Sequence, residues 1–261
     1  MRPVLPGHEA ASVRMSTTRA ARASVNCDLS PMGRGLIITA DDYGYSPGYD
    51  EGIVEAAAAG AVDSVSVMVT RGRLDTEPLL QTGVETGLHL ELPLELTELE
   101  TAGSREREAA LRALSEQLEA FESALGGPPA YLDGHRHCHA QAGLAAAVAR
   151  EARRHRLPVR SIDAAHRRIL RGEGVATPDR LVGRYSEEPE GALPVELQAV
   201  VDGDGELDPG VTEWMVHPGY PDRDSGSGYD RAREEDLDLL LSLCLLPALR
   251  GARLNHGAAF G

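Results

Sequence analysis

Residues 35–69 alternate between hydrophobic patterns that are typical of strand, helix and strand. The apolar run at 35–40 predicts a buried strand, and the Ser-Pro pair at 46–47 predicts the first turn of an Ala-rich helix. The alternating run at 62–69 predicts a second strand. A strand, a helix and another strand in this order indicate a parallel βαβ crossover, which limits the chain to the α/β folds.

The same alternation continues to the end of the chain. About six or seven β/α units in one run predict a single α/β domain, a distorted (β/α) TIM-like barrel with about six to seven parallel strands. An open doubly wound sheet is the alternative. The further predicted strands are 85–92, 130–135, 157–163, 211–218 and a short last strand at 252–256, and the further predicted helices are 104–125, 140–155 and 229–249.

Residues 1–34 differ in composition from the rest of the chain. They contain five arginines and two acids, without apolar periodicity. They also lack the apolar core that a secretory signal needs. We therefore expect a disordered leader at 1–34 and one folded domain at 35–261.

The composition also excludes several classes of partner. A net charge of -15 argues against nucleic acid and against an anionic membrane surface, since both attract basic patches. No apolar run reaches the ~20 residues of a membrane helix. The widely spaced Cys27, Cys138 and Cys244 predict a reducing, cytoplasmic location rather than a disulfide framework. A homodimer is compatible with the sequence.

Polar side chains stand where the predicted strands end. In parallel α/β folds these carboxyl ends meet at one rim, where ligands bind. Carboxylates and imidazoles that gather at such a rim are suitable ligands for a divalent metal. The residues at these positions are Asp41 and Asp42, His89, Asp133 and His135, and His217.

The segment YLDGHRHCHAQ at 131–141 carries three histidines at alternate positions, His135, His137 and His139. A solvated polar turn is the simple explanation of such a cluster. Imidazole gains little from burial, however, because both ring nitrogens need partners. Together with the acids and histidines at the other strand ends, the cluster favours a metal site.

Four motifs in this order resemble the YdjC-like carbohydrate deacetylases, also called diacetylchitooligosaccharide deacetylases. They are ADDYGYSPGYDEGIVEAAAAGAVDSVSVMV, GLHLEL, YLDGHRHCH and EWMVHPGYPD. The resemblance runs from about residue 35 to the end and is weakest at 166–210. It implies a distorted (β/α) barrel that removes the N-acetyl group from acetylated amino sugars with one divalent metal.

The resemblance also implies roles for individual residues. Asp42, His89 and His135 would bind the metal, and Asp41 would be the catalytic base. The sequence departs from the family pattern at three positions. Gly134 replaces a usual Ser, Cys138 a small aliphatic residue and Glu91 a common Thr.

The remaining candidates follow from the chemistry of amide hydrolysis, which needs an activated water, a polarised carbonyl and a proton for the leaving amine. His217 is the candidate for the acid, or for the group that orients it. Asp133 could fix a histidine tautomer, and His137 and His139 could support the ligands or contact the sugar. The third ligand stays open between His89 and His139, which is four residues from His135.

The predicted activity is a hydrolase acting on linear amides that releases acetate from an acetylated amino sugar or a short chitooligosaccharide. The ligand set favours Zn²⁺ by its chemistry, whereas the family resemblance suggests Mg²⁺. One alternative is a phosphoesterase or amidohydrolase barrel, although such barrels usually begin with HxH where this chain has two aspartates. The other alternative is a non-catalytic carbohydrate-binding protein, which would be expected to lose Asp41.

Overall fold

The computed structural model describes residues 33–72, 74–93, 96, 103–183, 193–202, 204–226, 230–244 and 246–261. The predicted leader lies outside the described residues, except for its last two. In the described part, no helix is long and apolar enough to cross a membrane.

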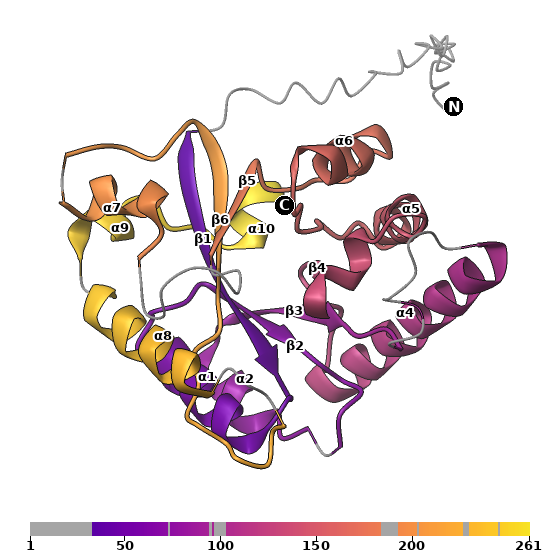
Figure 1. Ribbon diagram of the computed structural model, residues 1–261, viewed down its shortest axis with the longest axis horizontal. Helices are drawn as coiled ribbons and strands as arrows, with labels where there is room; N and C mark the ends of the chain where they lie inside the picture. Colours follow the sequence, from indigo (N-terminus) through magenta and orange to yellow (C-terminus); the bar gives the residue numbers. More distant parts are fainter. Residues whose placement is uncertain are drawn as a thin grey trace, which may run out of the picture. The chain divides into compact units, whose positions relative to one another are not determined.

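One sheet of six parallel strands forms the centre of the domain, in the order β4-β3-β2-β1-β6-β5 (Figure 1). The sheet curls into a half-barrel, which agrees with a distorted barrel, while closure into a full ring remains an expectation. The strands are β1 (Arg34–Tyr43), β2 (Ser64–Val67), β3 (Glu85–Leu90), β4 (Leu132–Gly134), β5 (Arg180–Gly183) and β6 (Gly210–Val216).

Helices cover the sheet from outside (Figure 1). The first begins at Pro47 after the N-cap Ser46, as the Ser-Pro pair predicts. Between β4 and the next α-helix lies a 3₁₀ turn, η1 (His135–Ala140). The helices are α1 (Pro47–Ala58), α2 (Glu77–Thr82), α4 (Ser104–Leu125), α5 (Ala145–His155), α6 (Ala164–Gly172), α7 (Val195–Asp202), α8 (Asp230–Leu243), α9 (Pro247–Arg250) and α10 (His256–Phe260).

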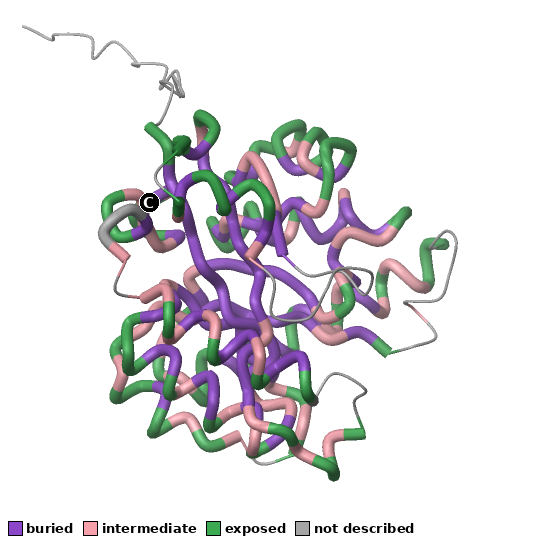
Figure 2. Tube along the Cα trace, turned by 60° about the vertical axis from the view of Figure 1, so that its left-hand side comes forward, coloured by how far each residue is buried: buried purple, intermediate pink, exposed green. Residues whose placement is uncertain are grey.

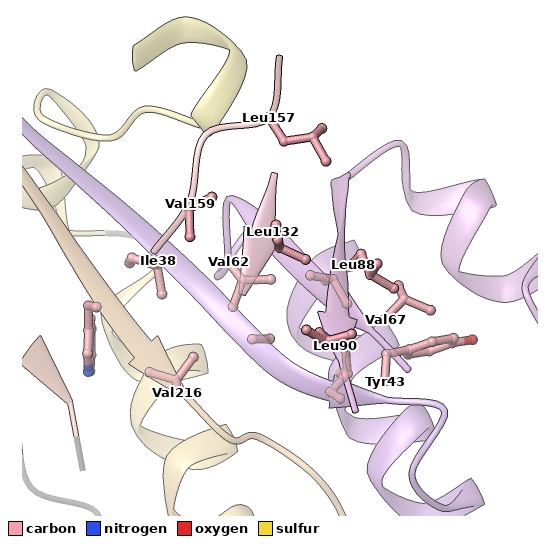
Figure 3. Close-up of a cluster of buried hydrophobic side chains, with 14 of the residues drawn as sticks. Ile38, Tyr43, Val62, Val67, Leu88, Leu90, Leu132, Leu157, Val159 and Val216 are labelled. Carbon is pink, nitrogen blue, oxygen red and sulfur yellow. The ribbon is translucent and has the colours of Figure 1, made fainter. Parts of the chain in front are cut away.

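The hydrophobic core lies between the sheet and these helices. Figure 2 shows continuous burial along the central strands, while the helices alternate between buried and exposed positions. Ile38, Leu88 and Leu132 come from three different strands and belong to one buried cluster (Figure 3). Both faces of the strands are covered, but the strands are not apolar throughout: β2 alternates Ser and Val, and all four of its residues are buried.

Two predicted strands are reduced to single bridges. The segment predicted as a strand at 157–163 pairs with β4 only through Val159 and Leu132. Pro158 lacks an N–H, so it cannot extend a ladder of hydrogen bonds. The segment predicted at 252–256 likewise makes one bridge, from Arg253 to Leu36. Conversely, β5 lies between residues 163 and 211, where the sequence predicts no strand.

The histidine-rich segment is not a strand beyond Gly134. Arg136 and His137 have left-handed backbones, with φ of 51° and 56°, inside the 3₁₀ turn η1. Strand alternation therefore does not govern where His135, His137 and His139 point. Cys138 is buried there, as expected for a small apolar residue, but it lies on this turn.

Candidate metal and catalytic site

The two adjacent aspartates lie within β1, at a bulge. The register against β2 is irregular between Ala40 and Tyr43, and Asp42 has φ of 74°. An extra residue in a strand re-aims neighbouring side chains that would otherwise point to opposite faces. Both Asp41 and Asp42 are buried, and both lie among the site residues described below.

Asp42 meets two histidines from different elements. Its Oδ1 lies 3.2 Å from Nε2 of His89 on β3, and 3.0 Å from Nδ1 of His135 at the start of η1. The ligand atoms of these three residues all lie within 4.8 Å of one another. Burial raises the pKa of Asp42, but hydrogen bonds with His135 and His89 hold it well below its usual range. One carboxylate and two imidazoles form a donor set that suits a divalent metal.

Asp133 lies on the other side of the His89 ring. Its Oδ1 is 2.7 Å from Nδ1 of His89, and its Oδ2 accepts a hydrogen bond of 2.6 Å from Ser66. Because an ionised carboxylate only accepts, Nδ1 of His89 donates to Asp133. The other ring nitrogen, Nε2, faces Asp42, as in sites where a carboxylate orients a ligating histidine.

Arg160 ties three carboxylates together and is not among the residues predicted from the sequence. Its Nη1 and Nη2 donate to the two oxygens of Asp41 at 2.6 and 2.8 Å. The same side chain bonds Asp133 at 2.8 Å and Glu213 at 2.9 Å, and it is fully buried. The available signal was an arginine inside the apolar segment LPVRSID, since a buried charge needs a partner.

Arg233 on α8 was also not predicted. Its Nη2 donates to Oδ2 of Asp42, the oxygen that does not face the histidines. Its guanidinium lies over the ring of Tyr49, 3.8 Å from the centroid. No local pattern in α8 marks this arginine, because its partner lies on β1.

The formal charges of this cluster do not balance. Four carboxylates face two guanidiniums, and one negative charge remains in this buried place even when the ring of His89 is counted as protonated. Burial lowers the pKa of His89, yet the charges of Asp133 and Asp41 raise it to about 10. The site thus attracts positive charge, and a divalent cation fits it. The groups are Asp41, Asp42, Asp133 and Glu213 with Arg160 and Arg233.

His217 follows the end of β6 and is half-buried. Its backbone N–H donates to Oδ2 of Asp236 on α8 at 3.0 Å. Burial lowers the pKa of its ring, although the charges of Asp42 and Asp41 act in the opposite direction.

The two later histidines of the cluster differ in burial: His137 is half-buried and lies near enough to Asp41 and Asp133 for their charges to act on it, whereas His139 lies in the core. His139 is fully buried, and its Nε2 lies 3.1 Å from the backbone carbonyl of Arg160. Burial lowers its pKa well below the usual range and lowers that of His137 to about 4. Among the described residues, the group that could hold a metal through Asp42 contains His89 and not His139.

A pocket of about 480 Å³ lies next to His135. Glu91 lines it and forms an ion pair with Arg71, whose guanidinium lies 4.0 Å from the centroid of the Tyr45 ring. The pocket thus combines charged groups with apolar surface beside a metal-ligand candidate, which suits a sugar-sized ligand. Its other lining residues are Thr70, Leu92, Pro93, Ala113, Gln117 and Arg136.

Known proteins resemble this chain over most of its length. Residues 35–250 match the family model described as YdjC-like protein. The chain belongs to the YdjC-like family. The YdjC-like chain is 32% identical over 248 residues to a carbohydrate deacetylase from Geobacillus stearothermophilus. The alignment covers 85% of this chain and 96% of the relative.

The YdjC-like chain also resembles two further proteins, one in sequence and one in fold. A chitooligosaccharide deacetylase from Serratia marcescens is 29% identical to this chain over 255 residues. The alignment covers 88% of this chain and 98% of the relative. The crystal structure of a putative cellobiose-phosphate cleavage protein from Enterococcus faecalis V583 has a TM-score of 0.69 at 22% identity, covering 88% of this chain and all (100%) of that one. The last likeness shows a shared fold.

Proposed function

We propose that this YdjC-like chain is a metal-dependent hydrolase. It removes the N-acetyl group from an acetylated amino sugar or a short chitooligosaccharide and releases acetate. The observation that carries the proposal is the group formed by Asp42, His89 and His135 with the carboxylate of Asp41 beside it. The substrate class is supported by the names of relatives that align over nearly their whole length.

In this proposal Asp42, His89 and His135 hold one divalent ion. When bound, such an ion supplies Lewis acidity, which polarises an amide carbonyl and makes water more acidic. The three side chains come from β1, β3 and η1, so the fold brings them together before any substrate arrives. Asp133 holds Nδ1 of His89, so Nε2 is the ring nitrogen that would bind the ion once it has lost its own proton.

Asp41 is the proposed general base. Two hydrogen bonds from Arg160 fix the plane of its carboxylate, and each of its oxygens keeps a further lone pair to accept a proton. The ligand atoms of Asp41 and His89 lie within 4.8 Å of each other, so Asp41 reaches the edge of the metal group. A proton taken from water at this place leaves a nucleophile beside the polarised carbonyl.

The leaving nitrogen needs a proton, because an amide anion is too basic to depart. His217 is the proposed donor. Burial lowers the pKa of His217, so its ring needs a proton before it can act as the acid. In the proposal Asp41 takes a proton from the attacking water and passes it to His217, which delivers it to the leaving nitrogen, so that both side chains return to their starting states.

Acetate release tests the proposal. The full chain is incubated with N,N′-diacetylchitobiose and with N-acetylglucosamine, before and after metal removal with EDTA. We expect acetate to appear, to stop after EDTA treatment and to return with added Zn²⁺ or Mg²⁺, which also identifies the preferred metal. Hydrolysis of a phosphate monoester without acetate release would favour the phosphoesterase alternative. Sugar binding without any hydrolysis would favour the non-catalytic one.

A further inference from the structure

We propose that Arg233 is a positioning residue that lowers the affinity of the group Asp42, His89 and His135 for a divalent metal. The same residue stabilises this group when no metal is bound. The inference rests on the proposed function only in taking this group as the metal site. It concerns how tightly the metal is held, and hence how readily it exchanges.

The two oxygens of the Asp42 carboxylate have different partners. Oδ1 faces His89 and His135, while Oδ2 accepts a hydrogen bond from Nη2 of Arg233. Both side chains of this ion pair are 4% exposed. An occupied Oδ2 limits Asp42 to one ligand atom, so Arg233 sets how the carboxylate can bind.

Arg233 is fixed from two other directions. Its guanidinium stacks on Tyr49 of α1, and its backbone carbonyl accepts a hydrogen bond of 3.2 Å from the N–H of Gly219. A side chain at 219 would place its Cβ 3.0 Å from Cα of Tyr49 and 3.4 Å from Cδ of Arg233. Gly219 of the HPGY motif thus leaves room for this pair of side chains.

The rest of the guanidinium has few compensating contacts. Nε and Nη1 of Arg233 are buried and have no hydrogen-bond partner among the described residues. The cation therefore depends mainly on Asp42 for its stabilisation, and Asp42 gains a counter-charge in return. A buried pair of this kind is strongly coupled, because removal of one partner leaves the other uncompensated.

The same charge opposes metal binding. A divalent ion at Oδ1 of Asp42 would share this carboxylate with the guanidinium at Oδ2, at a place that water barely reaches. Like charges so close in a medium of low dielectric repel strongly. Arg233 therefore stabilises the metal-free site and destabilises the loaded site, both through Asp42.

The substitution Arg233→Met tests this, because Met keeps an apolar stem on Tyr49 and removes the charge. Zinc affinity is measured by competition with a fluorescent chelator, and Tm is measured in EDTA and in saturating Zn²⁺. We expect the zinc Kd to fall by about tenfold or more. We also expect the Tm in EDTA to fall further than the Tm in zinc.

Arg253→Met is the matched control. Arg253 also forms a largely buried pair, 2.9 Å from Asp63, with 12% and 13% exposure, and neither residue belongs to the metal group. Its loss should lower Tm equally in EDTA and in zinc and leave the zinc Kd unchanged. A purely structural role of Arg233 would give this same pattern.

Arg233→Lys keeps the charge and provides the measurement if Arg233→Met does not fold. The zinc Kd of Arg233→Lys should stay within about threefold of the wild-type value. If the Kd of Arg233→Lys falls as much as is expected for Arg233→Met, the proposal is overturned. An unchanged or raised Kd in Arg233→Met would also overturn it. A wild type that binds zinc and releases acetate keeps the proposed function intact in either case. A wild type that binds neither Zn²⁺ nor Mg²⁺ contradicts both.

Discussion

Oδ1 of Asp133 lies 2.7 Å from Nδ1 of His89, with both side chains buried at the edge between β3 and β4. The two residues are partners in the parallel register, so the sheet itself sets this contact. Asp133 thereby decides which nitrogen of His89 faces Asp42. It does so without belonging to the group of Asp42, His89 and His135 itself.

Asp133→Asn should weaken metal binding while the fold is retained. An amide can hold the His89 ring through its oxygen but supplies no charge to raise the basicity of the ring. We expect metal affinity to fall by about 10–100-fold, as is usual for a lost carboxylate behind a ligating histidine. Calorimetric titration with Zn²⁺ measures the change. Ser66→Ala, which removes the hydrogen bonds of this hydroxyl with Asp133 and Tyr131 but no charge, is the matched control and should have a smaller effect.

Asp42→Asn and Asp41→Asn should separate the two acids. The first replaces a carboxylate ligand by a weaker neutral group, so both metal and activity should be lost. The second should retain the metal, while kcat falls by roughly 10²–10⁴-fold, the usual contribution of a positioned general base. Metal content is determined beside kcat for each variant. Equal metal loss in both would mean that the carboxylates bind together, and full activity in Asp41→Asn would exclude it as the base.

Gly134→Ala should destabilise the protein through Cys138. A Cβ at 134 would lie 2.9 Å from Sγ of Cys138 and 2.9 Å from Nδ1 of His139. Overpacking of this kind typically costs about 1–3 kcal/mol in the free energy of unfolding. The double variant Gly134→Ala with Cys138→Ala should recover part of that loss, which urea denaturation of both variants will measure. Additive effects of the two substitutions would contradict this coupling.

Acidification should destabilise the protein partly through His166. Burial lowers the pKa of this ring to about 4, from about 6.5 for an exposed histidine. Between these values the unfolded chain binds more protons than the folded one, so stability is present above pH 6.5 and is lost as the pH falls toward 4. His166→Gln should flatten the dependence of the free energy of unfolding on pH in this window. The change is at most about 1.4 kcal/mol per pH unit, and an unchanged slope would assign the acid sensitivity to other groups.

Much of the fold could be predicted from local patterns. The strand, helix and strand at 35–69 became β1, α1 and β2, because an apolar run and an alternating run both indicate strands and Ser-Pro begins a helix. The acids and histidines at the strand ends could be named for the same reason, since parallel strands deliver their carboxyl ends to one rim. The end of β4 was less predictable. The 3₁₀ turn at His135 replaced the strand that alternate histidines suggested.

The sequence by itself determined the parallel α/β architecture and the candidates Asp41, Asp42, His89 and His135, because each depends on residues close to it in the chain. Only the tertiary structure decided which groups surround them. Arg160 reaches Asp41 across 119 positions and Arg233 reaches Asp42 across 191. The residues next to Arg160 and Arg233 in the sequence do not indicate which acid each arginine pairs with. The pairing arises because a buried charge must find a counter-charge wherever the folded chain provides one.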